Sequence, residues 1–200
     1  MNPERDAIAE TAARLVAEGQ SASLESALHR LEAPAGIAPA ARRHLHAMDL
    51  RRLGEDGMTA ARRDMLESAL AVMETIDLLE ARVADSGIPY RGVRLVGVAA
   101  EGRPDLREAV HLRIHGDRSP AAWLEELSVL EPLDERRFTS ETRYGRLSGF
   151  ELNIDGTVVR AHRCPVDQVP LEDRHLFTGV GISVATLAMV RRLADDTPRS

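Results

Sequence analysis

The hydrophobic period of this chain changes near Pro89, and that change restricts the folds open to it. Between Thr59 and Gly87, apolar side chains recur every three to four residues, which predicts the longest helix of the chain. Beyond Pro89, residues 91–98 and 110–115 alternate apolar and polar side chains, which predicts two strands. A chain that places its helices first and its strands later is expected to be an α+β protein.

The first part of the chain predicts a helical region. Apolar stripes at helical spacing predict helices over residues 3–19, 23–31 and 40–53, with the linker "EAPAGIAPA" before the third and the break "GEDG" after it. We therefore divide the chain into an N-terminal helical region, residues 1–57, and an α+β domain, residues 58–200.

The second part adds further elements to the predicted sheet. The pattern predicts helices over residues 121–130 and 182–194, a short edge strand over 137–142, and strands over 147–154 and 157–164. Asp155-Gly156 between the last two strands is a strong signal for a hairpin with a two-residue loop. In that hairpin Glu151 lies opposite Arg160, and an apolar face is buried. The members of this face are Phe150, Leu152, Ile154, Val159 and Ala161.

Charge and cysteine content exclude several classes of protein. The net charge of −6 argues against general nucleic-acid binding, which needs a basic surface. The N-terminus lacks an apolar signal core, and no apolar run approaches the ~18 residues that span a bilayer, so we expect a cytoplasmic protein without a membrane segment. Cys164 is the only cysteine, which excludes a disulfide framework and is expected to be an ordinary free thiol.

Several stretches, taken in order, resemble a known superfamily. They are "DAIAETAARLVAEG", "RLVGVAAEG", "HLRIHGDRSPAAWLEEL" and "NIDGTVVRAHRCP". Their succession of helix, strand, glycine turn, strand, helix and hairpin resembles the nucleotidyltransferase superfamily typified by DNA polymerase β, and more narrowly its small bacterial members. The resemblance implies a small mixed sheet with flanking helices.

The resemblance also implies an active site that this chain does not reproduce. The enzymes carry a glycine turn, an Asp-x-Asp pair and a third carboxylate, which together hold two divalent cations. Gly97 matches the glycine, but Ala109 and His111 take the places of the acid pair, and Arg160 takes the place of the third acid. Because a guanidinium cannot ligate a metal, we expect a non-catalytic relative with no metal site.

A working enzyme is the alternative, and it would need displaced acids. The chain offers Glu101, Asp105, Glu108 and Glu151, of which Glu108 and Glu151 are the catalytic candidates. Magnesium is the cofactor expected in that case alone.

The polar faces of the strands have three interpretations, which are a metal site, a solvated surface and an anion site. His111, His115 and His162 could hold a transition metal, but His111 and His115 lie ~13 Å apart along one strand, so we favour a solvated polar face. The third interpretation is a site for a phosphate, a nucleotide or another small anion. Its ligand-binding residues would be Gly97, His111, Arg113, Arg160 and His162.

The apolar surplus of the long helix and of the last helical segment raises a further hypothesis. A homodimer interface would use this surplus, and packing against the sheet of the same chain would use it equally well. A structural or regulatory homo-oligomer without a ligand is therefore also retained.

Overall fold

The computed structural model describes residues 3–106 and 109–198, and it divides into two compact units, Met1–Met58 and Thr59–Ser200. The division falls one residue after the boundary expected from the sequence. The chain is α+β, with an N-terminal helical region and a six-stranded mixed sheet. Each unit is described on its own.

The first unit is a small helical cluster. It contains α1 (Pro3–Ala17), α2 (Leu24–Arg30) and the beginning of α3 (Ala38–Arg82). The Ser23 hydroxyl caps α2 by accepting a hydrogen bond from the Ser26 N–H at 3.1 Å. Small side chains allow the helices to approach closely, and the buried set is Ala9, Ala12, Ala13, Val16, Ala27, Ala41 and Leu45.

The expected break at "GEDG" is confirmed. The span α3 consists of two helices that meet at a kink at Gly54, whose φ of 70° and ψ of −179° are not helical. Glycine adopts this positive φ at little cost, so a single residue interrupts the helix.

The second unit is built on the sheet, whose strand order is β3-β4-β5-β2-β1-β6. All neighbouring pairs are antiparallel except β2 and β5, which are parallel. The strands are β1 (Tyr90–Val96), β2 (Val110–Gly116), β3 (Asp134–Thr142), β4 (Gly145–Ile154), β5 (Thr157–Cys164) and β6 (Val184–Thr186). Among the described residues, three short 3-10 helices occur: Ala84–Ser86 before β1, Gly97–Glu101 between β1 and β2, and Ser128–Leu130 before β3.

The predicted hairpin is confirmed in its register and in its buried face. Ile154 pairs with Thr157 and Glu151 pairs with Arg160 across the two-residue turn. The five apolar side chains expected on one face are all buried there. Local alternation and the Asp155-Gly156 turn were sufficient to fix this register.

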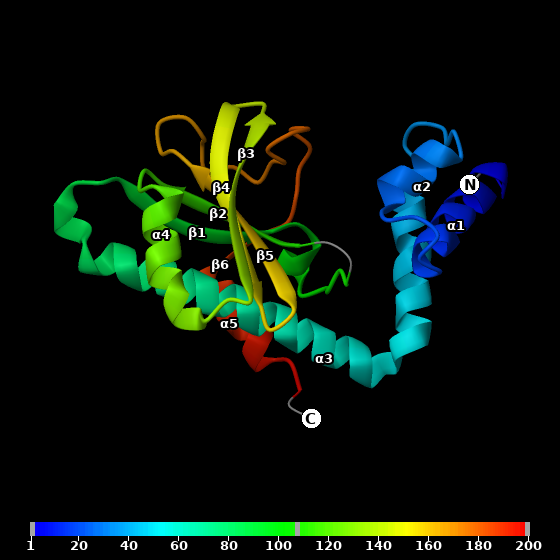
Figure 1. Cartoon of the computed structure of the whole chain (residues 1–200), viewed down its shortest axis with the longest axis horizontal. Coiled ribbons are helices and arrows are strands. Elements are labelled where there is room, and N and C mark those ends of the chain that lie inside the picture. Colours follow the sequence, from blue (N-terminus) through cyan, green and yellow to red (C-terminus); the bar gives the residue numbers. More distant parts are fainter. Residues whose placement is uncertain (1–2, 107–108, 199–200) are drawn as a thin grey trace. The chain divides into compact units, whose positions relative to one another are not determined.

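The two faces of the sheet are covered differently (Figure 1). The main core lies between the strands and three helices, namely the second part of α3, α4 (Pro120–Leu127) and α5 (Leu187–Asp195). Residues 165–183, the orange stretch between β5 and β6 in Figure 1, cover the opposite face over a smaller core. That smaller core consists of Leu147, Cys164, Val169 and Leu176, with Tyr144 packed against it.

The end of the chain corrects one prediction. The last helix begins at Leu187 rather than Ile182, because Val184–Thr186 form strand β6 and pair with β1. The edge strand β3 also begins three residues earlier than expected, at Asp134.

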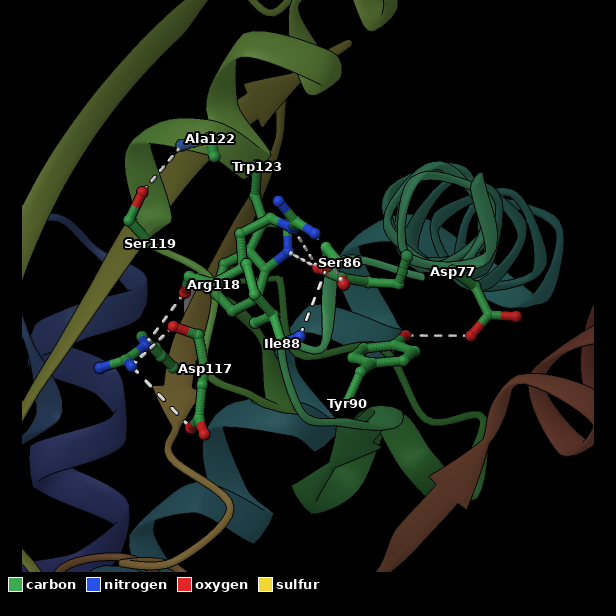
Figure 2. Close-up of polar contacts among 11 residues, drawn as sticks. Asp77, Ser86, Ile88, Tyr90, Asp117, Arg118, Ser119, Ala122 and Trp123 are labelled. Carbon is green, nitrogen blue, oxygen red and sulfur yellow. Dashed lines mark hydrogen bonds and ion pairs between the residues drawn. The ribbon is translucent and has the colours of Figure 1, made fainter. Parts of the chain in front are cut away.

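A buried polar cluster fastens α3 to α4 and to the loop before it (Figure 2). Glu80 accepts hydrogen bonds from the Trp123 indole at 2.7 Å and from the Arg118 guanidinium at 2.8 Å. Nearby, the Tyr90 hydroxyl donates to Asp77 at 2.9 Å. The buried carboxylate is thus neutralised and hydrogen-bonded, which a charge in a core requires.

None of the helices within the described residues has the combination of length and apolar character needed to cross a bilayer.

Candidate functional site

A pocket of about 690 Å³ opens where β2 and β5 begin, and it lies wholly within the second unit. The two strands are parallel and in register, so His111 lies beside Arg160. We call this the His111 pocket. Its lining includes Ala61, Asp64, Met65, Pro104, Asp105, Leu106, Ala109, Val110, His111, Glu151, Asp155, Gly156, Thr157, Val158 and Arg160. The positions that the family resemblance assigns to the catalytic acids, Ala109, His111 and Arg160, therefore share one pocket.

An ion-pair network occupies one side of the pocket. The Arg160 Nε and Nη2 atoms contact one oxygen of Glu151 at 2.7 and 2.5 Å, and Arg136 contacts the other oxygen at 2.7 and 2.5 Å. The Arg160 guanidinium also lies over the Phe138 ring, 5.6 Å from its centroid. Two cations share one carboxylate, so this network carries one excess positive charge. The predicted pairing of Glu151 with Arg160 is confirmed.

His111 is held in its neutral form. Burial, followed by the neighbouring charges of Arg160 and His175, lowers its pKa to about 4, and Glu151 and Asp105 only partly oppose this shift. At neutral pH the imidazole therefore presents one hydrogen-bond donor and one acceptor.

Acidic side chains line the rest of the pocket. Among the described residues of the lining, Asp64, Asp105 and Asp155 join Glu151, and Arg160 is the one cation. Within residues 3–106 and 109–198, no group of three His, Cys, Asp or Glu side chains could hold a metal ion. Glu108, one of the two catalytic candidates, lies outside the described residues.

Gly97 and Glu101 contact Ser183 and do not line the pocket. Gly97 has φ 80° at the end of β1, as a glycine turn requires, but its N–H donates to the Ser183 carbonyl at 2.9 Å. Glu101 accepts a hydrogen bond from the Ser183 hydroxyl and pairs with Arg103. Neither residue belongs to the lining of the His111 pocket.

Arg113 and His162 lie beside the pocket, beneath residues 165–183. Arg113 is 3% exposed, His162 is 5% exposed and the neighbouring His115 is 1% exposed. The solvated polar face expected from the sequence is therefore wrong, because residues 165–183 exclude solvent from it. Of the five ligand-binding candidates, the structure brings His111 and Arg160 together in the pocket and places Gly97, Arg113 and His162 elsewhere.

Sequence reasoning missed the helical wall of the pocket. Ala61, Asp64 and Met65 lie on α3 at spacings of three and four residues, so they share one face of that helix. This spacing is visible in the sequence. The sequence does not show that this face of α3 lies against the beginning of β2 and β5. Asp155 was recognised only as a turn residue, although the same turn places it at the mouth of the pocket.

Comparisons with known proteins add no assignment to this geometry, since no family model, no curated protein and no solved structure matches the chain.

Proposed function

We propose that this chain is a non-catalytic protein of nucleotidyltransferase-like architecture that binds a small polar ligand in the His111 pocket. In this proposal Arg160 receives an anionic group of the ligand, and neutral His111 hydrogen-bonds to a polar group beside it. The observation that carries the proposal is the pocket itself. It holds His111 and Arg160 where the superfamily would hold metal-binding acids.

The volume supports a ligand of nucleoside or mononucleotide size. Pockets for small molecules commonly enclose about 300–1,000 Å³, and about 690 Å³ is within this range. Arg160 uses Nε and Nη2 for Glu151, and its Nη1 atom takes no part in these contacts. This donor is the one that a ligand carboxylate or phosphate would use.

The charges around the pocket favour a ligand with few negative charges. Among the described residues, four carboxylates and one guanidinium line it, and His111 adds no charge at neutral pH. Because like charges repel most strongly where water is scarce, a triphosphate is disfavoured relative to a monophosphate or a carboxylate. This order applies in the absence of magnesium, because carboxylates can bind that ion together with the phosphates of a triphosphate.

Calorimetric titration of the whole chain tests the proposal. We expect a nucleoside monophosphate to bind more tightly than the corresponding triphosphate when magnesium is absent. Arg160→Gln should weaken monophosphate binding by about tenfold or more, because a charge-assisted hydrogen bond is lost. Arg136→Gln is the matched control, since Arg136 contacts the same carboxylate from outside the pocket, and it should change the affinity less than threefold.

Three results would reject the proposal. Equal losses in Arg160→Gln and Arg136→Gln would show that the variants act through Glu151 rather than through the pocket. Magnesium-dependent release of pyrophosphate from a nucleoside triphosphate, abolished in Glu151→Gln, would establish the enzyme alternative instead. If no compound binds and the chain elutes as a stable oligomer, the structural hypothesis takes its place.

A further inference from the structure

Residues 165–183 cover a patch of the sheet that holds arginine, histidine and cysteine side chains. Beneath them lie Arg113 and His115 of β2 and His162 and Cys164 of β5, each no more than 5% exposed. Arg94 of β1 pairs with Arg113 in the neighbouring strand, which adds a second guanidinium to the row. We call residues 165–183 the cover and this patch the covered face.

The covered face contains buried polar atoms that the chain does not satisfy. The Nδ1 atom of His115, the Nε2 atom of His162 and the Nε atoms of Arg94 and Arg113 are buried without a hydrogen-bond partner among the described residues. Buried polar atoms without a partner destabilise the state in which the cover lies on the sheet. They therefore lower the free energy needed to release the cover.

The cover is attached through its backbone, through a few apolar side chains and through polar contacts at Tyr144. The Tyr144 hydroxyl donates to Glu172, and Gln168 donates to the Tyr144 carbonyl. Arg113 donates to the carbonyls of Glu172 and Arg174, at 3.3 and 2.6 Å, and His115 hydrogen-bonds to the backbone of Val169. Val169 and Leu176 supply the apolar contacts to Cys164. Phe177 lies edge-on to His162, 5.9 Å between ring centroids, yet remains 47% exposed.

We propose that acid releases the cover, because protonation of His115 and His162 adds positive charge beneath it beside Arg94 and Arg113. The released state exposes the covered face and the thiol of Cys164, while the main core on the other side of the sheet stays folded. This inference is independent of any ligand in the His111 pocket.

The charged groups around His115 and His162 favour release of the cover at low pH. Arg91 and Arg94 face His115 from β1, and Arg113 lies between the two imidazoles on β2. Around His162 the charged or titratable groups are His111, Arg113, Arg160 and His175. The acids nearest to this set, Glu172 and Asp173 of the cover and Glu151 of β4, act on Arg113 and on His111.

The pH range follows from the two states of each histidine. Burial lowers the pKa of His115 and of His162 to about 4, whereas an exposed histidine has a pKa near 6.5. The released state therefore binds protons below about pH 6.5, and the covered state does not until about pH 4. Each histidine shifts the equilibrium toward release by roughly tenfold per pH unit in this interval.

The thiol of Cys164 reports the release in the full chain. It is fully buried, and burial raises its pKa to about 12, so it is unreactive while the cover is closed. We propose to measure its labelling by 4,4′-dithiodipyridine between pH 7.5 and 5.0, relative to the urea-unfolded chain at each pH. The protection of Cys164 should fall by at least about 30-fold, which is the contribution of one histidine over 1.5 pH units.

Trp123 provides the internal control for global unfolding. It is fully buried in the main core, on the other side of the sheet from Cys164. Urea unfolding followed by its emission gives the free energy of global unfolding at each pH. The free energy of opening obtained from Cys164 protection should be smaller than this value at every pH. Equal values would overturn the proposal in favour of global unfolding, and constant Cys164 protection down to pH 5.0 would overturn it outright.

Variants assign the effect to the two imidazoles. His115→Gln with His162→Gln should remove the pH dependence of labelling, whereas His29→Gln, on α2 of the first unit, should retain it. If the double variant does not fold, hydrogen exchange of the wild-type chain replaces it. Residues 165–183 should then lose protection below pH 6.5 while α4 keeps its protection, and equal loss in both segments would contradict the proposal.

Discussion

At the scale of single residues, Glu80 is a buried carboxylate that holds two hydrogen-bond donors. Its carboxylate lies 5% exposed and accepts hydrogen bonds from Trp123 and Arg118. Glu80→Ala should lower the free energy of unfolding by about 3–5 kcal/mol, because it leaves a guanidinium and an indole N–H unpaired. Urea unfolding followed by Trp123 fluorescence measures this loss. Glu125→Gln, on the exposed side of α4, should change the stability by less than about 0.5 kcal/mol, and a similar loss in both variants would contradict the account.

Gly149 makes a second prediction at this scale. A Cβ atom at this position would lie 2.3 Å from the Ala161 carbonyl oxygen and 2.6 Å from the Phe138 ring. Gly149→Ala must therefore displace β5 or the Phe138 ring, and it should cost about 1–3 kcal/mol in thermal or urea unfolding. Ser148→Ala, at the neighbouring position of the same strand, is the control and should be nearly neutral; a neutral Gly149→Ala would show that the strands yield without cost.

At the scale of elements, Arg113 joins the cover to the sheet. Arg113→Met keeps the length of the side chain but removes the donors to the Glu172 and Arg174 carbonyls. We expect residues 165–183 to become cleavable by protease at neutral pH, where the wild-type chain resists. Arg174→Gln keeps the carbonyl that Arg113 contacts and should leave the segment protected, so equal cleavage in both variants would argue against this attachment.

Local sequence patterns predict some elements of this fold and not others. The hairpin of β4 and β5 follows from alternation and a two-residue turn, both of which are local, and its register could be predicted residue by residue. Strand β6 could not, because Val184–Thr186 become a strand only by pairing with β1, about ninety residues earlier in the chain. Residues 165–183 carry no hydrophobic period, so nothing local indicates that Val169 and Leu176 bury the polar face of the sheet.

The candidate site, too, could be predicted only in part from local sequence patterns. The resemblance assigned His111 and Arg160 to corresponding positions, and the parallel pairing of β2 with β5 places them side by side. The contribution of Asp64 from α3 depends on how that helix lies against the sheet, which a sequence period does not specify. Alternation alone does not distinguish a solvated face of a strand from one that a loop covers, so it does not predict the burial of His115 and His162.

At the scale of the whole molecule, the buried histidines make stability depend on pH. His115 and His162 stay neutral in the fold down to about pH 4 but bind protons below about pH 6.5 when the chain unfolds. The unfolded state then binds more protons, so the free energy of unfolding falls as pH falls from 6.5 to 4, by on the order of 2 kcal/mol for each histidine. Urea unfolding at pH 7.5, 6.0 and 4.5 measures this slope. A constant stability over the interval would contradict the burial of these imidazoles.

The central claim is that a small polar ligand binds in the His111 pocket, and histidine NMR tests it most directly. The chain has seven histidines, so the imidazole signals of the whole protein can be resolved and assigned by single substitutions. Titration with a nucleoside monophosphate should shift the His111 signal and leave His29 and His46 of the first unit unchanged. An unchanged His111 signal at saturating ligand, or shifts confined to the first unit, would contradict the account.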